Sequence, residues 1–199
     1  MSATQPRSES EETPVFRRAR PDDAVEMALA TFVSGERVDM QSLATRLDVS
    51  PATLYRWFGS RAQLLDRAFA LLSLDFATAA RAAARGEGDE RVCDYARHIM
   101  VSAAGFEAMR SFVAREPQLA LRLLLGKDGS VHRVVTEQTA EVIAETRSPE
   151  EAHEIDAHVH MIVQVATALV WATFMIGDAP EIDSAVELIR MVLASSRTS

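Results

Sequence analysis

The sequence predicts an all-α fold, with an N-terminal three-helix head followed by a C-terminal helical body. Apolar residues recur at the three- and four-residue spacing of a helix face along most of the chain. No stretch of alternating β-branched residues indicates a strand. The 8 glycines and 7 prolines are few, and they fall at gaps between the helical stretches. Helices are therefore the expected building blocks.

Composition indicates a soluble, cytoplasmic protein. The 199 residues are 48% hydrophobic and 25% charged, which is enough apolar material for a core. Cys93 is the one cysteine, so no internal disulfide can form. The polar N-terminus shows no signal peptide, and no apolar run is long enough to span a bilayer. The net charge of −8 argues against a uniformly basic nucleic-acid surface, although Arg17, Arg18 and Arg20 cluster before the first helix.

The chain divides into a polar tail of residues 1–14, expected to be disordered, a head of residues 15–66 and a body of residues 67–199. The first helix is predicted from Pro21 to Ser34, ahead of a glycine. The second is predicted from Met40 to Leu47, with an aspartate as its N-cap.

The third predicted helix begins at Pro51 after a capping serine and ends at Gly59. A helix of about eight residues between short turns is typical of the second helix of a helix-turn-helix, which reads bases in the major groove of DNA. The fourth helix begins at Ser60, where Gln63 completes a capping-box pattern, and continues to about Arg85. Six body helices are predicted at 90–104, 106–115, 118–125, 131–145, 149–176 and 180–195.

The third helix presents two different faces. Leu54 and Phe58 share the face expected to pack on the second helix. On the other face, Ala52 can touch a thymine methyl group, and Arg56 can donate to guanine or phosphate. Nearby hydroxyl, amide and guanidinium groups suit phosphate oxygens. The predicted DNA-binding residues are Gln41, Thr45, Arg46, Ser50, Pro51, Ala52, Thr53, Tyr55, Arg56 and Arg61.

The segment from Val38 to Phe69 resembles the DNA-binding domain of the TetR family of bacterial transcriptional regulators. The matching residues are Leu43-Ala44, Val49-Ser50, Thr53-Leu54-Tyr55, Phe58, Ser60-Arg61 and Leu64-Leu65. The resemblance implies a homodimeric repressor that binds a near-palindromic operator and is released by a small ligand. In the body, FVAREPQLALRLLL and TALVWATFMIGDAPEID resemble the QsdR-type subgroup. That subgroup implies control of lactone catabolism, including the acyl-homoserine lactones of quorum sensing.

The resemblance also assigns roles to residues of the body. An apolar stripe on the last helix is expected to form the dimer interface in a four-helix bundle, and consists of Ile182, Val186, Ile189 and Leu193. A pocket for a small apolar ligand is expected between the fourth helix and those after it. Its predicted lining consists of Tyr95, His98, Met109, Phe112, Gln164, Thr167, Trp171 and Met175, with Met100, Phe106 and Phe174 as further apolar candidates.

Two alternatives to a DNA-binding regulator stay open from the residues alone. One is a ferritin-like metal enzyme, because EEAHEIDAHVH contains Glu150-x-x-His153 followed by Glu154, His158 and His160. A second copy of Glu-x-x-His is missing, so no metal, cofactor or catalytic residue is predicted. The other is a helical binding module that does not use DNA.

Overall fold

The computed structural model describes residues 18–195, without the side chains of residues 150, 151, 153, 154, 156, 157, 173 and 174. The predicted disordered tail, Arg17 and the side chains of Glu150, His153, Glu154 and Phe174 therefore lie outside the described residues. The described residues form ten helices and no strand, which confirms the all-α prediction. The helices are α1 (Pro21–Val33), α2 (Met40–Arg46), α3 (Pro51–Phe58), α4 (Arg61–Ala83), α5 (Gly88–Gly105), α6 (Glu107–Arg115), α7 (Pro117–Leu125), α8 (Ser130–Thr146), α9 (Pro149–Met175) and α10 (Ile182–Ser195).

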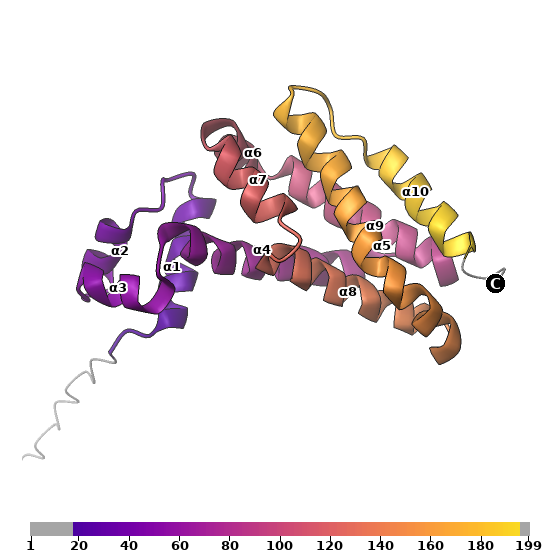
Figure 1. Ribbon diagram of the computed structural model, residues 1–199, viewed down its shortest axis with the longest axis horizontal. Helices are drawn as coiled ribbons and strands as arrows, with labels where there is room; N and C mark the ends of the chain where they lie inside the picture. The colour runs from indigo at the N-terminus through magenta and orange to yellow at the C-terminus, as the bar shows by residue number, and fades with distance from the viewer. Residues whose placement is uncertain (1–17, 196–199) are drawn as a thin grey trace, which may run out of the picture.

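Helices α1–α3 form a head at one end of the molecule, and α4 runs from this head into the body (Figure 1). In the body, α4 packs mainly against α5 and α8, while α10 packs against α5 and α9. The predicted domain boundary at residue 66 falls inside α4, which contributes to both parts. That boundary stays a prediction, because one continuous helix joins the head to the body.

The ends of the head helices are fixed by local hydrogen bonds. Asp39 caps α2 and Ser60 caps α4, each by accepting a bond from the backbone N–H three residues later. Gly35, at φ 79°, ends α1 in the left-handed conformation that glycine tolerates best. The two caps explain why the predicted starts of α2 and α4 agree with the structure.

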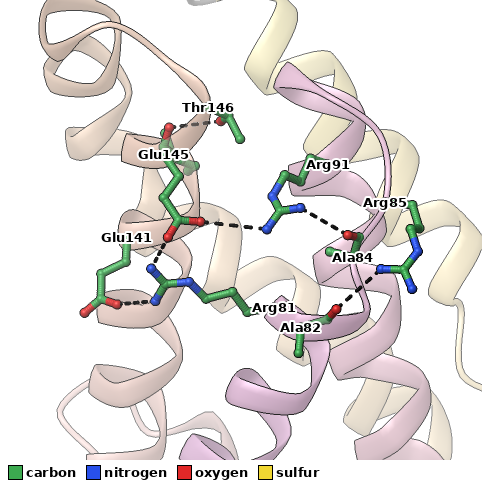
Figure 2. A network of polar contacts seen from close by, with 9 residues as sticks. Arg81, Ala82, Ala84, Arg85, Arg91, Glu141, Glu145 and Thr146 are labelled. Atoms are coloured by element: carbon green, nitrogen blue, oxygen red, sulfur yellow. Dashed lines mark hydrogen bonds and ion pairs between the residues drawn. The ribbon is translucent and has the colours of Figure 1, made fainter.

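An ion-pair network fixes the C-terminal part of α4 to the body (Figure 2). Arg81 donates to Glu141 and Glu145, which lie one turn apart on α8, and the Arg81–Glu141 contact measures 2.7 Å. Arg91 of α5 lies 4.0 Å from Glu145 and donates to the Ala84 carbonyl at the end of α4. The network therefore joins three helices at the end of α4 farthest from the head.

Earlier along α4, the carboxylate of Asp66 accepts bonds from the backbone N–H and the hydroxyl of Ser130, at 3.1 and 2.5 Å. Ser130 is the first residue of α8, so Asp66 satisfies a free donor at that helix start and places a negative charge at its positive end. Helix α4 is thus tied to α8 at two widely separated points.

The predicted dimer stripe on α10 requires a correction. Val186, Ile189 and Leu193 are 2%, 4% and 0% exposed within the single chain, and Ile182 is half-buried. Because α10 lies against α5 and α9 of its own chain, these residues belong to the core of the body. The sequence pattern located the apolar face of the helix correctly, but it did not distinguish packing in the same chain from packing against a partner.

A buried arginine fixes the end of α10. The Arg147 side chain is 1% exposed and donates to Asp89 at 2.7 Å and to the Leu193 carbonyl at 2.7 Å. Arg147 therefore joins the α8–α9 connection to the first turn of α5 and to the last turn of α10. None of the described helices is long and apolar enough to cross a membrane.

Candidate DNA-binding face and central cavity

Helix α3 is held at both ends and along its inner face. The Ser50 hydroxyl accepts a bond from the Thr53 N–H at 3.1 Å, and Gly59 ends the helix at φ 73°. Leu54 and Phe58 are buried against the rest of the head, as predicted. Trp57 is half-buried and meets Phe58 edge to face, with ring centroids 6.4 Å apart. The packing of the inner face of α3 therefore fixes the position of its outer face.

The turn between α2 and α3 is a Schellman motif centred on Asp48, which adopts a left-handed φ of 53°. The Asp48 N–H donates to the Thr45 carbonyl at 3.2 Å, and the Val49 N–H donates to the Ala44 carbonyl at 3.0 Å. Ala44 is buried where the two helices approach each other. This tight connection gives α2 and α3 the relation of a helix-turn-helix.

Most of the predicted DNA-binding residues lie on the surface of the head. The exposed ones are Gln41, Thr45, Arg46, Ser50, Pro51, Ala52, Tyr55 and Arg56. Tyr55 is 50% exposed, which is high for a large aromatic side chain. Thr53 is half-buried and its hydroxyl lies 3.0 Å from that of Ser50. The surface is therefore accessible to DNA, and the contacts themselves stay a prediction.

Two of the predicted phosphate-binding arginines have partners within the protein. Arg46 is exposed, but it donates to the hydroxyl of Thr31 in α1 at 2.9 Å. Arg61 is more strongly bound, since its Nε donates to the Val38 carbonyl at 2.6 Å and its two terminal nitrogens donate to Glu116 at 2.7 and 2.8 Å. In this structure the Arg61 guanidinium joins the head to the body, and its contact with phosphate stays a prediction.

The Arg61–Glu116 pair occupies the junction between α6 and α7. The hydrogen bonds from Arg61 hold the pKa of the Glu116 carboxyl below its usual value, against the opposing effect of partial burial. Arg115 reaches the head as well, with a long contact of 3.5 Å to the Gly35 carbonyl. The sequence does not reveal this connection, because Arg61 and Glu116 are 55 residues apart.

A cavity of about 100 Å³ lies in the centre of the body. Its walls come from α4, α5, α8, α9 and α10, with one residue each from α6 and α7. The position agrees with the prediction of a pocket between α4 and the helices after it. The volume is below the roughly 300–1,000 Å³ typical of sites for drug-sized ligands. A larger ligand therefore requires some wall side chains to move.

Some of the residues predicted to bind a ligand surround this cavity, and their role in binding stays a prediction. Tyr95, Met109, Thr167 and Trp171 line the cavity, as does Met100. The other predicted residues whose side chains are described lie outside the cavity wall. His98 is half-exposed on α5 and contacts the Asp94 carbonyl at 2.8 Å. Phe112 packs edge to face on Phe69, with ring centroids 5.2 Å apart.

Gln164, Met175 and Phe106 also lie outside the cavity wall. The Gln164 amide donates to the Leu125 carbonyl at 3.1 Å, while Met175 and Phe106 are half-buried against the core. The residues that the sequence did not identify as lining include Leu72, Phe76, Ile99, Val135, Thr139, Ile189 and Leu193. Their apolar spacing predicts an inward face, but periodicity carries no information on where the packed faces leave a space.

Tyr95 is the main polar feature of the cavity. It is 1% exposed, and its hydroxyl has no hydrogen-bond partner among the described residues. Burial raises the pKa of Tyr95 to about 12, and the Thr139 hydroxyl exerts a smaller effect in the opposite direction. That hydroxyl donates to the Val135 carbonyl at 2.7 Å, and its contact with Tyr95 falls short of hydrogen-bond geometry.

The described histidines do not assemble a metal site. His132 Nε2 lies 2.8 Å from His160 Nδ1 between α8 and α9, and burial lowers the pKa of His132. His158 is exposed. Among the residues whose side chains are described, no group of three or more histidine, cysteine, aspartate or glutamate residues is arranged to hold a metal ion.

Comparisons with known proteins agree with this arrangement of head and body. Residues 87–194 match the family described as tetracyclin repressor-like, C-terminal domain. The chain is 27% identical to the R. erythropolis transcriptional repressor QsdR from the TetR family, with a TM-score of 0.80 over 87% of this chain and 94% of that one. It shares its fold with AlkX, a TetR family repressor from Dietzia sp. strain DQ12-45-1b implicated in biodegradation of n-alkanes, at 21% identity and a TM-score of 0.65 over 92% of this chain and 98% of that one. None of the curated proteins matches the chain. Because the matched region covers more than half of its residues, the chain belongs to the TetR family of transcriptional regulators.

Proposed function

We propose that the chain is a ligand-responsive repressor that binds a near-palindromic operator as a homodimer. The observation that carries this proposal is the outer face of α3, where exposed Ala52, Tyr55 and Arg56 stand on a helix fixed by caps and by buried Leu54 and Phe58. A short, rigid and exposed helix of this kind suits insertion into the major groove. Members of the family are regulators rather than enzymes.

The dimer is proposed to form through the outer faces of α9 and α10 in place of the buried stripe. Met161 and Met191 are 52% and 55% exposed, which is high for apolar side chains. Leu188, one turn before Met191, is partly exposed, and Ala172 on α9 is exposed. The two helices pack together in the chain, so a second copy of the pair would complete a four-helix bundle.

Met191→Glu tests the dimer without disturbing the core, because the side chain already faces outward. We expect a monomer by sedimentation equilibrium, since a charge buried in an apolar interface is unfavourable. Val101→Glu on α5 is the matched control, because Val101 is 52% exposed on another surface. If the Met191→Glu variant remains a dimer, as the Val101→Glu variant is expected to, the interface lies elsewhere.

The releasing ligand is proposed to be small and predominantly apolar and to bind in the central cavity. The wall is largely aliphatic and aromatic, and Met100 and Met109 can change shape to enlarge it. The resemblance to the QsdR-type subgroup favours a lactone, with acyl-homoserine lactones as the quorum-sensing candidates. We expect such a regulator to act in the cytoplasm.

Selection from a random DNA pool tests the function directly. The enriched site is retested by fluorescence anisotropy at several salt concentrations, with wild type and Arg56→Ala. We expect a near-palindromic site, and a weaker affinity for Arg56→Ala through the loss of one guanine or phosphate contact. Arg133→Ala on α8 is the control, because Arg133 is an exposed arginine of the body. Failure to enrich any sequence would favour a helical binding module that does not use DNA.

A further inference from the structure

The cavity contains one incomplete polar interaction. Among the described lining residues, Tyr95 alone has a buried side-chain polar atom without a partner. A buried hydroxyl that makes no hydrogen bond lowers the stability of the folded state. A phenylalanine would fill the same volume without this cost. The packing of the described residues therefore does not explain the hydroxyl.

The position of the hydroxyl is known from its surroundings. The Thr139 hydroxyl, which lines the cavity from α8, lies close enough to affect the pKa of Tyr95. The Thr139 proton is directed to the Val135 carbonyl at 2.7 Å. The end of the Tyr95 ring thus lies near α8, and its hydroxyl makes no hydrogen bond to the described residues.

The charge of the wall restricts the ligand further. None of the described residues that line the cavity is charged. The charged groups that influence the pKa of Tyr95 are Arg81 of α4 and Glu141 of α8, which bind each other (Figure 2). A carboxylate or an ammonium group in the cavity would be buried without a counter-ion, which is strongly unfavourable. The wall therefore favours an uncharged ligand.

We propose that Tyr95 donates a hydrogen bond to the carbonyl oxygen of a neutral ligand in the central cavity, and that this bond selects carbonyl compounds over hydrocarbons and carboxylates. The inference rests on the proposed function, since it assumes that the cavity is the ligand site. It adds the chemical class of the ligand and the residue that recognises it. A binding site with a buried donor discriminates against a ligand that cannot pair with it, because the donor is then left unsatisfied.

The experiment compares three six-membered-ring probes on the full chain. Cyclohexanone carries the carbonyl, methylcyclohexane has a similar shape without it, and cyclohexanecarboxylate is charged. Dissociation constants are measured by isothermal titration calorimetry for wild type and Tyr95→Phe. Tyr55→Phe is the matched control, because Tyr55 is the other tyrosine of the chain and lies in the head, outside the cavity.

We expect Tyr95→Phe to weaken cyclohexanone binding by about 3- to 10-fold, the range of one neutral hydrogen bond. Methylcyclohexane binding should change less than about 2-fold, and cyclohexanecarboxylate should bind worst to the wild type. The melting temperature of Tyr95→Phe should equal or exceed that of wild type, because the variant removes an unsatisfied hydroxyl. A residue with a purely structural role would not give this combination.

The possible failures can be told apart. Equal weakening of cyclohexanone and methylcyclohexane, or a lower melting temperature of Tyr95→Phe, would make the hydroxyl structural and overturn the inference alone. If cyclohexanecarboxylate binds as tightly as cyclohexanone, the proposal that the ligand is uncharged is wrong. If no probe binds the wild type while a near-palindromic DNA site is still enriched, the cavity is not the ligand site. That result would refute the ligand part of the proposed function, and the inference with it.

Discussion

Removing the Arg61–Glu116 pair tests how the head is attached to the body. The two hydrogen bonds of the pair measure 2.7 and 2.8 Å, and the side chains are 22% and 26% exposed. Exposed ion pairs contribute about 0.2–1 kcal/mol to the stability of the folded protein. A bidentate arginine–carboxylate pair lies toward the upper end of that range. We therefore expect a coupling energy of about 1 kcal/mol between the two side chains.

The coupling is measured by a double-mutant cycle with Arg61→Ala, Glu116→Ala and the double variant, each unfolded in urea. Arg61→Ala should destabilise the protein more than Glu116→Ala, because the Val38 carbonyl also loses its donor. The difference is expected to be about 0.5–1 kcal/mol. The double variant should be more stable than the sum of the single changes predicts.

The same coupling should depend on pH. The pKa of Glu116 is lowered in the folded protein by the hydrogen bonds from Arg61, relative to its ordinary value of 4.5. A carboxyl whose pKa is depressed on folding stabilises the protein above its unfolded pKa and loses that effect as the pH falls through the folded value. The coupling should therefore be fully present at neutral pH, weaken as the pH falls below 4.5, and be lost once the pH lies below the lowered pKa of the folded protein.

DNA binding supplies the result that would refute this reasoning. A phosphate contact by Arg61 would make the slope of log affinity against log salt shallower by about 0.9 in Arg61→Ala. We expect no such change, because the guanidinium is occupied within the protein. A shallower slope together with zero coupling to Glu116 would show that Arg61 serves DNA, as the sequence first indicated.

Three further predictions concern single residues. Tyr55→Phe should weaken operator binding by about 1 kcal/mol, measured by anisotropy, while the urea midpoint stays unchanged, because the exposed hydroxyl has no role in the core. Asp89→Asn should destabilise the protein by about 3 kcal/mol, since it removes the carboxylate charge that accepts two hydrogen bonds from the buried Arg147 guanidinium; a cost below about 1 kcal/mol would contradict the assignment. Asp48→Gly should stabilise it by about 0.5 kcal/mol, because glycine adopts the left-handed φ of 53° more easily, and thermal unfolding that shows a loss would contradict this.

Local signals in the sequence predicted most of the fold. The caps at Asp39, Ser50 and Ser60 act within one helical turn, so the residues that create them are visible side by side in the sequence. The buried anchors of α3 followed for the same reason, from the spacing of Leu54 and Phe58. Contacts between residues that are close in sequence can therefore be predicted from the sequence alone.

The sequence does not predict contacts between distant parts of the chain. Whether Arg61 meets phosphate or Glu116 depends on a helix junction 55 residues away. The stripe through Ile189 is apolar in either reading, and only the packing of α5 beside α10 shows that it faces the core. Phe112 has the character of a pocket residue, yet it is enclosed by Phe32 and Phe69. Residue type and period cannot distinguish these cases.

Under the proposed function, two connections lead from the cavity to the head. Helix α4 carries cavity residues Leu72 and Phe76 and begins at the head, while cavity residues Met109 and Leu124 lie on either side of Glu116 in sequence. The Arg61–Glu116 pair, at about 1 kcal/mol, can change affinity by about 5-fold. Coupling between sites usually amounts to about 1–3 kcal/mol, so the pair accounts for the lower end of that range and the packing of α4 must supply the rest. Glu116→Ala should therefore reduce the release of DNA by ligand without abolishing it. A variant that loses all response would show that the ion pair, and not α4, transmits the signal.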